Sequence, residues 1–132
     1  MIQRHVQEAP IILLIENDAG NRFLAERILA LSGYRCISAS NGREALQMLE
    51  FHAFDLILTD LSMPVLDGFR VAKLIRERPE FAHIPIVALT AHAFDAERQK
   101  ALRMGCTDLL VKPYRPKELL AMIARYLPGV AQ

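Results

Sequence analysis

Polar residues follow four short apolar runs of this sequence, each at the point where the run ends. In chain order they are Glu16-Asn17-Asp18, Asp60, Thr90 and Lys112, and they follow the runs 11–15, 56–59, 84–89 and 109–111. Two carboxylates held 4 Å apart repel by roughly 4 kcal/mol at an effective dielectric of 20. A hard divalent cation such as Mg²⁺ relieves this repulsion because it prefers oxygen ligands. The set therefore predicts an acidic site that binds a cation, provided that the runs are neighbouring strands.

The same residues are suited to phosphoryl transfer. A carboxylate in such a site can attack phosphorus and form an acyl phosphate. The reaction then requires positioning and neutralisation of the equatorial oxygens, for which a metal, the Lys112 ammonium and the Thr90 hydroxyl are appropriate groups. Taken singly, each residue has a plainer interpretation: Asp18 as a helix N-cap, Glu16 as a solvated charge, Asp60 as a turn residue. Their joint occurrence after four runs favours the functional interpretation.

The apolar runs alternate with amphipathic stretches along the whole chain. Strands are expected at 11–15, 34–39, 56–59, 84–89 and 109–111. The run 11–15 is aliphatic on both sides, which is typical of a strand buried on both faces of a parallel sheet. The alternation predicts an α/β fold, a doubly wound (βα)5 three-layer sandwich around a five-stranded parallel sheet. Ligands of such folds bind beyond the carboxyl ends of the strands, where the polar residues are found.

Apolar residues three or four positions apart predict a helix after each strand. The first would begin after the N-cap Asp18 and end at Gly33, with Leu24, Ile28 and Leu31 as its apolar face. The helix expected at about 94–104 has the poorest apolar face of the set.

Composition excludes several functional classes. Sixteen Lys and Arg against fifteen Asp and Glu leave a net charge of +1, so we expect no direct binding to nucleic acid. The longest apolar runs, 11–15 and 119–124, are far shorter than the ~20 residues of a membrane span. The first ten residues lack a signal-peptide core, and Cys36 and Cys106 form no CxxC pair. These features predict a single-domain cytoplasmic protein that does not insert into membranes.

Five segments resemble the receiver domains of response regulators in two-component signalling, the CheY-like family. They are IILLIEND at 11–18, NGREAL at 41–46, DLILTDLSMPVLDGF at 55–69, PIVALTAHA at 85–93 and LLVKPY at 109–114. The resemblance implies a receiver domain over 10–127, an N-terminal extension at 1–9, a C-terminal tail at 128–132 and no output domain. It also implies the flavodoxin-like strand order 2-1-3-4-5. Residues 21–22 and 88–93 are similar to receivers of hybrid histidine kinases.

The resemblance assigns the acceptor and the metal ligands. Asp60 would accept a phosphoryl group from a phosphohistidine on a histidine kinase or a histidine phosphotransfer protein. Glu16 would hold Mg²⁺ through water, while Asp60 and the main-chain carbonyl of Ser62 would bind it directly. The protein would be a regulatory phospho-acceptor rather than a conventional enzyme.

The remaining site residues would bind the phosphoryl group and report its presence. Lys112, joined by a cis bond to Pro113, would pair with the phosphoryl oxygens, and the amide of Ala91 would help to cradle them. Thr90 would move toward the group as a switch and change a surface that binds a downstream protein. The protein would be a monomer or a weak homodimer.

Two positions depart from the family pattern. Asn17 stands where an acidic residue usually binds Mg²⁺ directly, and its amide oxygen brings no charge, so we expect weaker metal binding and slower or failed phosphorylation. Leu109 stands where many receivers have a Tyr or Phe that rotates inward on activation. A pseudo-receiver, a protein-interaction module that works without phosphorylation, is therefore the alternative function. A third hypothesis, an aspartyl-phosphate hydrolase, would require an acid where Ser62 stands.

Overall fold

The structure is a computed structural model that describes residues 9–63, 66–92 and 94–127. Its strands are β1 (Ile11–Ile15), β2 (Arg35–Ala39), β3 (Leu56–Asp60), β4 (Ile86–Thr90) and β5 (Asp108–Val111). Its helices are α1 (Ala19–Leu31), α2 (Gly42–Met48), α3 (Gly68–Arg76), the 3₁₀ turn η1 (Pro79–Phe81), α4 (Asp95–Arg103) and α5 (Pro116–Tyr126). The extension and tail expected at 1–9 and 128–132 lie outside the described residues, except for residue 9.

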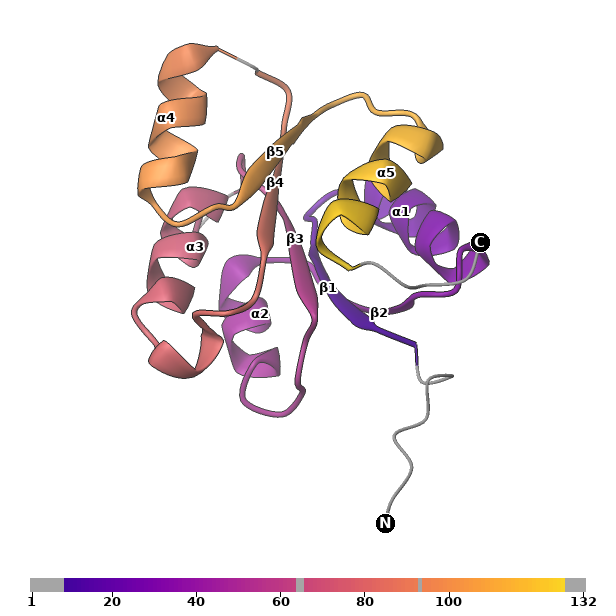
Figure 1. Ribbon diagram of the computed structural model, residues 1–132, viewed down its shortest axis with the longest axis horizontal. Coiled ribbons are helices and arrows are strands. Elements are labelled where there is room, and N and C mark those ends of the chain that lie inside the picture. The colour runs from indigo at the N-terminus through magenta and orange to yellow at the C-terminus, as the bar shows by residue number, and fades with distance from the viewer. Residues whose placement is uncertain (1–8, 64–65, 93, 128–132) are drawn as a thin grey trace.

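The strands form one parallel sheet in the order β2-β1-β3-β4-β5. Helices α1 and α5 cover one face of the sheet, and α2, α3 and α4 cover the other (Figure 1). The predicted three-layer α/β sandwich and its strand order are confirmed. None of the helices in the described part of the chain is long and apolar enough to cross a membrane.

Alternate residues of β1 serve two separate cores, because successive side chains of a strand point to opposite faces. Ile12 and Leu14 pack with side chains of α1 and α5, whereas Leu13 and Ile15 pack with side chains of α2 and α3. Every residue of β3 and β4 is buried. The three central strands are therefore held rigidly, and so are the residues at their carboxyl ends.

The face that α1 buries differs in part from the prediction. Of the predicted residues, Ile28 packs half-buried against the core, but Leu24 is 59% exposed and Leu31 is 79% exposed, and Ala25 and Leu29 are buried instead. Ala25 and Leu29 are themselves four residues apart, and apolar residues lie on several sides of this helix. Hydrophobic spacing alone is therefore consistent with two faces of the helix. The packing of α1 on the sheet buries the face that carries Ala25 and Leu29.

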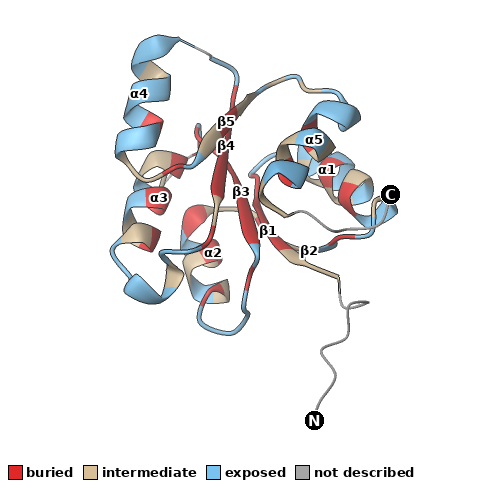
Figure 2. Cartoon of the chain, in the orientation of Figure 1, coloured by how far each residue is buried: buried red, intermediate tan, exposed pale blue. Residues whose placement is uncertain are grey.

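Helix α4 buries only one of its residues, Ala101, in agreement with the poor apolar face expected there. Figure 2 shows α4 as almost wholly exposed, in contrast to the buried strands beside it. Its N-cap residue Phe94 makes no side-chain hydrogen bond to the first turn. This helix is thus attached to the sheet by few interactions.

Candidate functional site

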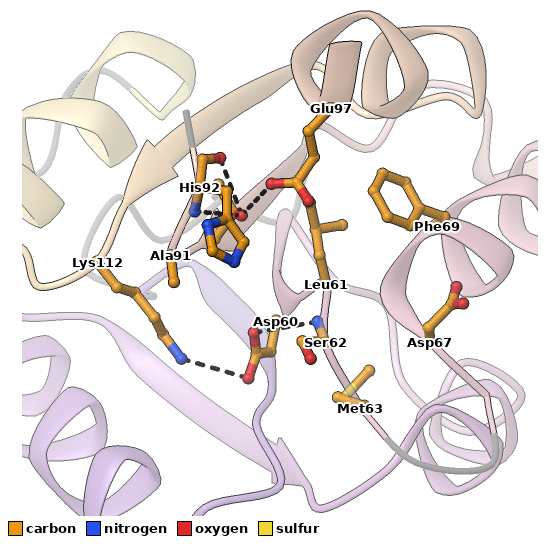
Figure 3. Close-up of a pocket in the computed structure, with 11 residues that line it drawn as sticks. Asp60, Leu61, Ser62, Met63, Asp67, Phe69, Ala91, His92, Glu97 and Lys112 are labelled. Atoms are coloured by element: carbon orange, nitrogen blue, oxygen red, sulfur yellow. Dashed lines mark hydrogen bonds and ion pairs between the residues drawn. The ribbon is translucent and has the colours of Figure 1, made fainter. Parts of the chain in front are cut away.

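The carboxyl ends of β1, β3, β4 and β5 bring the predicted polar residues to one edge of the sheet. Asp60 and Thr90 are the last residues of β3 and β4, and Glu16 and Lys112 come directly after β1 and β5. A hollow of about 480 Å³ opens here, and Asp60, Ser62, Thr90, Ala91 and Lys112 are among the residues that line it. Figure 3 shows Lys112 pointing toward Asp60 across this hollow.

Lys112 lies between two carboxylates. Its Nζ is 3.0 Å from Glu16 Oε1 and 3.3 Å from Asp60 Oδ2. Burial alone lowers the pKa of Lys112, but the hydrogen bond to Glu16 and the negative charges of Asp60 and Glu16 outweigh it, so the pKa is raised. Lys112 is therefore held in its charged form beside the Asp60 carboxylate.

Glu16 is almost completely buried, with 2% of its surface exposed. Its Oε2 accepts a hydrogen bond of 3.1 Å from the amide of Asp18. Burial raises the pKa of Glu16, and the negative charge of Asp60 adds to this, although the hydrogen bonds from Asp18 and Lys112 oppose it. Two carboxylates share one ammonium, which leaves the site acidic and suited to a further cation.

The donor set fits Mg²⁺ in chemistry, because Glu16, Asp60, the Ser62 carbonyl and the Asn17 amide all offer oxygen. No three His, Cys, Asp or Glu side chains gather as metal ligands within the described ranges. Asp18 does not replace the missing acid at position 17: its Oδ2 accepts a 2.8 Å hydrogen bond from the amide of Asn21. The N-cap interpretation of Asp18 is thus confirmed.

Sequence reasoning missed an acidic member of the site. Glu97 of α4 lines the hollow, and its Oε1 lies 2.5 Å from the hydroxyl oxygen of Thr90. Figure 3 shows the Glu97 side chain reaching from its helix into the hollow. An acidic residue in the first turn of a helix is common because of the helix dipole, so the sequence carried no signal for this contact.

Two further expectations concern the strand β5. The peptide bond between Lys112 and Pro113 is cis, as expected. Leu109 is 4% exposed and packs among the side chains of the core on the α2, α3 and α4 side of the sheet. The position where many receivers have an aromatic switch residue is therefore filled by a buried aliphatic side chain.

Comparison with known proteins agrees with this geometry. Residues 12–124 match the response regulator receiver domain family. The chain is 36% identical over 112 residues to the probable transcriptional regulator ycf29 of Porphyra purpurea, covering 85% of this chain and 54% of that protein. The chain thus spans about half the length of that regulator.

Two solved structures are similar over almost their whole length. The chemotaxis protein CheY4 of Vibrio cholerae has a TM-score of 0.87 and 31% identity, covering 90% of this chain and 99% of that one. The receiver domain of the sensor histidine kinase PA1611 of Pseudomonas aeruginosa PAO1 has a TM-score of 0.85 and 34% identity, covering 92% and 100%. That structure has a magnesium ion coordinated in its active site cleft.

Proposed function

The chain belongs to the response regulator receiver domain family of two-component phosphorelay signalling, and we propose that it accepts a phosphoryl group on Asp60. The donor would be a phosphohistidine of a histidine kinase or a histidine phosphotransfer protein. The observation that carries the proposal is the position of the Lys112 ammonium, 3.0 Å from Glu16 and 3.3 Å from Asp60. A scaffold without phosphoryl chemistry has no need for this buried charge cluster.

In the proposed reaction an Asp60 carboxylate oxygen bonds to phosphorus while the bond from phosphorus to the donor imidazole nitrogen breaks. The carboxylate requires no deprotonation step, so positioning and charge neutralisation are the main requirements. Lys112 stays at the site and neutralises the phosphoryl oxygens. The Thr90 hydroxyl and the Ala91 amide complete the cradle.

Glu16, Asp60 and the Ser62 carbonyl would hold Mg²⁺, with Asn17 as a neutral fourth donor. The ion would supply positive charge beside the phosphoryl oxygens during transfer. Because Asn17 contributes no charge, binding would be weaker than with an acid at that position. The magnesium-bound relative PA1611 supports the assignment of the metal.

The phosphorylated protein would act by a population shift that changes a surface for a downstream partner. This role makes it a regulatory phospho-acceptor that assists its own modification rather than an enzyme with turnover. A pseudo-receiver that binds its partner without phosphorylation is the second candidate, and Asn17 and Leu109 favour it.

The test is the intact mass after incubation with Mg²⁺ and either acetyl phosphate or phosphoramidate, whose phosphorus–nitrogen bond resembles that of phosphohistidine. The proposal predicts the gain of one phosphoryl group, which is absent in Asp60→Asn. A gain in Asn17→Asp but not in the native protein would favour the pseudo-receiver. No gain with either donor in either protein would overturn the proposed acceptor role.

A further inference from the structure

The Thr90 hydroxyl is already engaged by groups of the protein itself. It accepts a 3.0 Å hydrogen bond from the amide of His92. Its single hydrogen can be donated either to Glu97 Oε1 at 2.5 Å or to the His92 carbonyl at 3.1 Å. Donation to the carboxylate is favoured, because hydrogen bonds to a charged acceptor are shorter and stronger.

Glu97 also forms one of the few attachments of α4 to the rest of the protein. The helix buries only Ala101, and its N-cap Phe94 provides no side-chain cap. A second attachment is Lys100, whose Nζ lies 4.3 Å from the centroid of the Phe69 ring on α3. Both Glu97 and Phe69 line the hollow above Asp60. Helix α4 is therefore fixed largely through side chains rather than through a buried core, and Glu97 is the attachment of its first turn, whereas Lys100 lies in its last turn.

A phosphoryl group on Asp60 conflicts with this arrangement for two reasons. In the proposed function the group accepts the hydrogen of the Thr90 hydroxyl, which can be donated to only one acceptor at a time. It also carries a charge of about −1.5 to −2 into a hollow that the Glu97 carboxylate already lines.

We propose that Glu97 is a positioning residue that holds Thr90 in the unphosphorylated arrangement and competes with the phosphoryl group for its hydroxyl. When Thr90 turns to the phosphoryl oxygens, the first turn of α4 loses its attachment to the site. Information thus passes from Asp60 to α4 through Thr90 and Glu97, in a protein where Leu109 cannot act as an aromatic switch. The competition part of this inference rests on the proposed acceptor role of Asp60.

The first test needs no phosphorylation. Hydrogen exchange of the α4 amides is compared among the native protein, Glu97→Gln and the matched control Asp95→Asn. Asp95 lies in the same first turn, so its replacement removes the same charge from the helix N-terminus. We expect roughly threefold or faster exchange in Glu97→Gln, since local opening follows the loss of attachments, and little change in Asp95→Asn. Equal exchange in the two variants would overturn the proposal.

The second test is the rate of phosphorylation by acetyl phosphate, measured by intact mass. Glu97→Gln should be modified roughly three- to tenfold faster than the native protein, because the weakened contact opposes the transfer less. In a Thr90→Val background the acceleration should be clearly smaller, since the competition for the hydroxyl is gone and only the charge repulsion by Glu97 remains to be relieved. An equal acceleration in both backgrounds would show simple charge repulsion and overturn the competition for Thr90.

The two tests separate the failure of this inference from the failure of the proposed function. If the native protein gains no phosphoryl group, the acceptor role of Asp60 fails while hydrogen exchange still decides the Thr90–Glu97 contact. If the native protein is phosphorylated and Glu97→Gln exchanges and reacts like it, the acceptor role stands and the role of Glu97 is refuted.

Discussion

Gly68, the first residue of α3, lies directly against the main chain of Asp60. A Cβ atom built at Gly68 would overlap the Asp60 carbonyl oxygen and would lie 2.8 Å from the Cα of Leu61. The Gly68 amide donates a 3.1 Å hydrogen bond to the Leu61 carbonyl. The chain therefore comes back so close to the end of β3 that only glycine fits at position 68.

We predict that Gly68→Ala displaces the end of β3 and lowers both stability and phosphorylation. The overlap is with backbone rather than with a flexible side chain, so a loss of about 1–3 kcal/mol in the free energy of unfolding is expected. Urea unfolding and intact mass after acetyl phosphate treatment measure the two effects.

Gly20 provides the matched control. Its added Cβ would meet only Asp18 Oδ2 at 3.4 Å, an ordinary contact, so Gly20→Ala should stabilise α1 by about 0.5–1 kcal/mol. A Gly68→Ala protein with native stability and native phosphorylation would contradict the close approach described above.

Replacing Asn17 by Asp should tighten Mg²⁺ binding. The third carboxylate adds an attraction to the doubly charged ion of about 2–8 kcal/mol at 4 Å, depending on how well water screens it, so the Kd should fall at least about fivefold even if repulsion among the carboxylates offsets part of the gain. Isothermal titration calorimetry measures the change. Asn21→Asp adds the same charge in the first turn of α1 and serves as the control. Equal Mg²⁺ affinity of native and Asn17→Asp proteins would refute the idea that Asn17 weakens the metal site.

Glu16→Gln should stabilise the metal-free protein at neutral pH. Burial raises the pKa of Glu16 above its ordinary value of 4.5, so the folded state holds the ionised form less well than the unfolded state does. The resulting loss in the free energy of unfolding is absent below pH 4.5 and develops as the pH rises through the raised pKa. We therefore expect Glu16→Gln to raise the free energy of unfolding at pH 7 and the gain to disappear by pH 4.

Urea unfolding in the presence of a chelator, at pH 7 and at pH 4, tests this expectation. Loss of stability at pH 7 on Glu16→Gln would show that the pairing of Glu16 with Lys112 outweighs burial. The same variant should bind Mg²⁺ more weakly, since it removes one of the two carboxylates.

Tyr126→Phe should loosen the attachment of α5 to β5. The Tyr126 hydroxyl donates a 2.6 Å hydrogen bond to Asp108 Oδ2, and Arg125 contacts the same oxygen at 3.1 Å. Burial alone would raise the pKa of Asp108, but the hydrogen bonds from Tyr126 and the Leu109 amide and the charge of Arg125 lower it. We expect a loss of about 1 kcal/mol at pH 7.

The contribution of Asp108 to the free energy of unfolding depends on pH with the opposite sign to that of Glu16. A lowered pKa stabilises the protein above the ordinary value of 3.8 for Asp108, and this contribution is lost as the pH falls through the lowered pKa. The difference between the native protein and Tyr126→Phe should therefore shrink in acid. A double-mutant cycle with Asp108→Asn measures the coupling, and a coupling near zero at pH 7 would count against the interaction.

Much of the architecture follows from the sequence because its signals are local. Aliphatic runs bounded by polar residues located four of the five strands, although several ends shifted by one or two residues, and the strand expected at 34–39 rested on a weaker pattern. Asp18 was recognised as an N-cap because a cap needs only the next three residues. Since parallel strands end at one edge of the sheet, chain order was also sufficient to bring Glu16, Asp60, Thr90 and Lys112 together.

The tertiary structure decided what depends on the packing of one element against another. Hydrophobic spacing allowed two faces for α1, and docking on the sheet chose Ala25 and Leu29. Glu97 is seven residues from Thr90 and on another element, so only the position of α4 brings it to the hydroxyl. The placement of Lys112 between Glu16 and Asp60 likewise depends on distances across four neighbouring strands, β1, β3, β4 and β5. Sequence spacing identifies such groups, but the folded chain alone determines which of them touch.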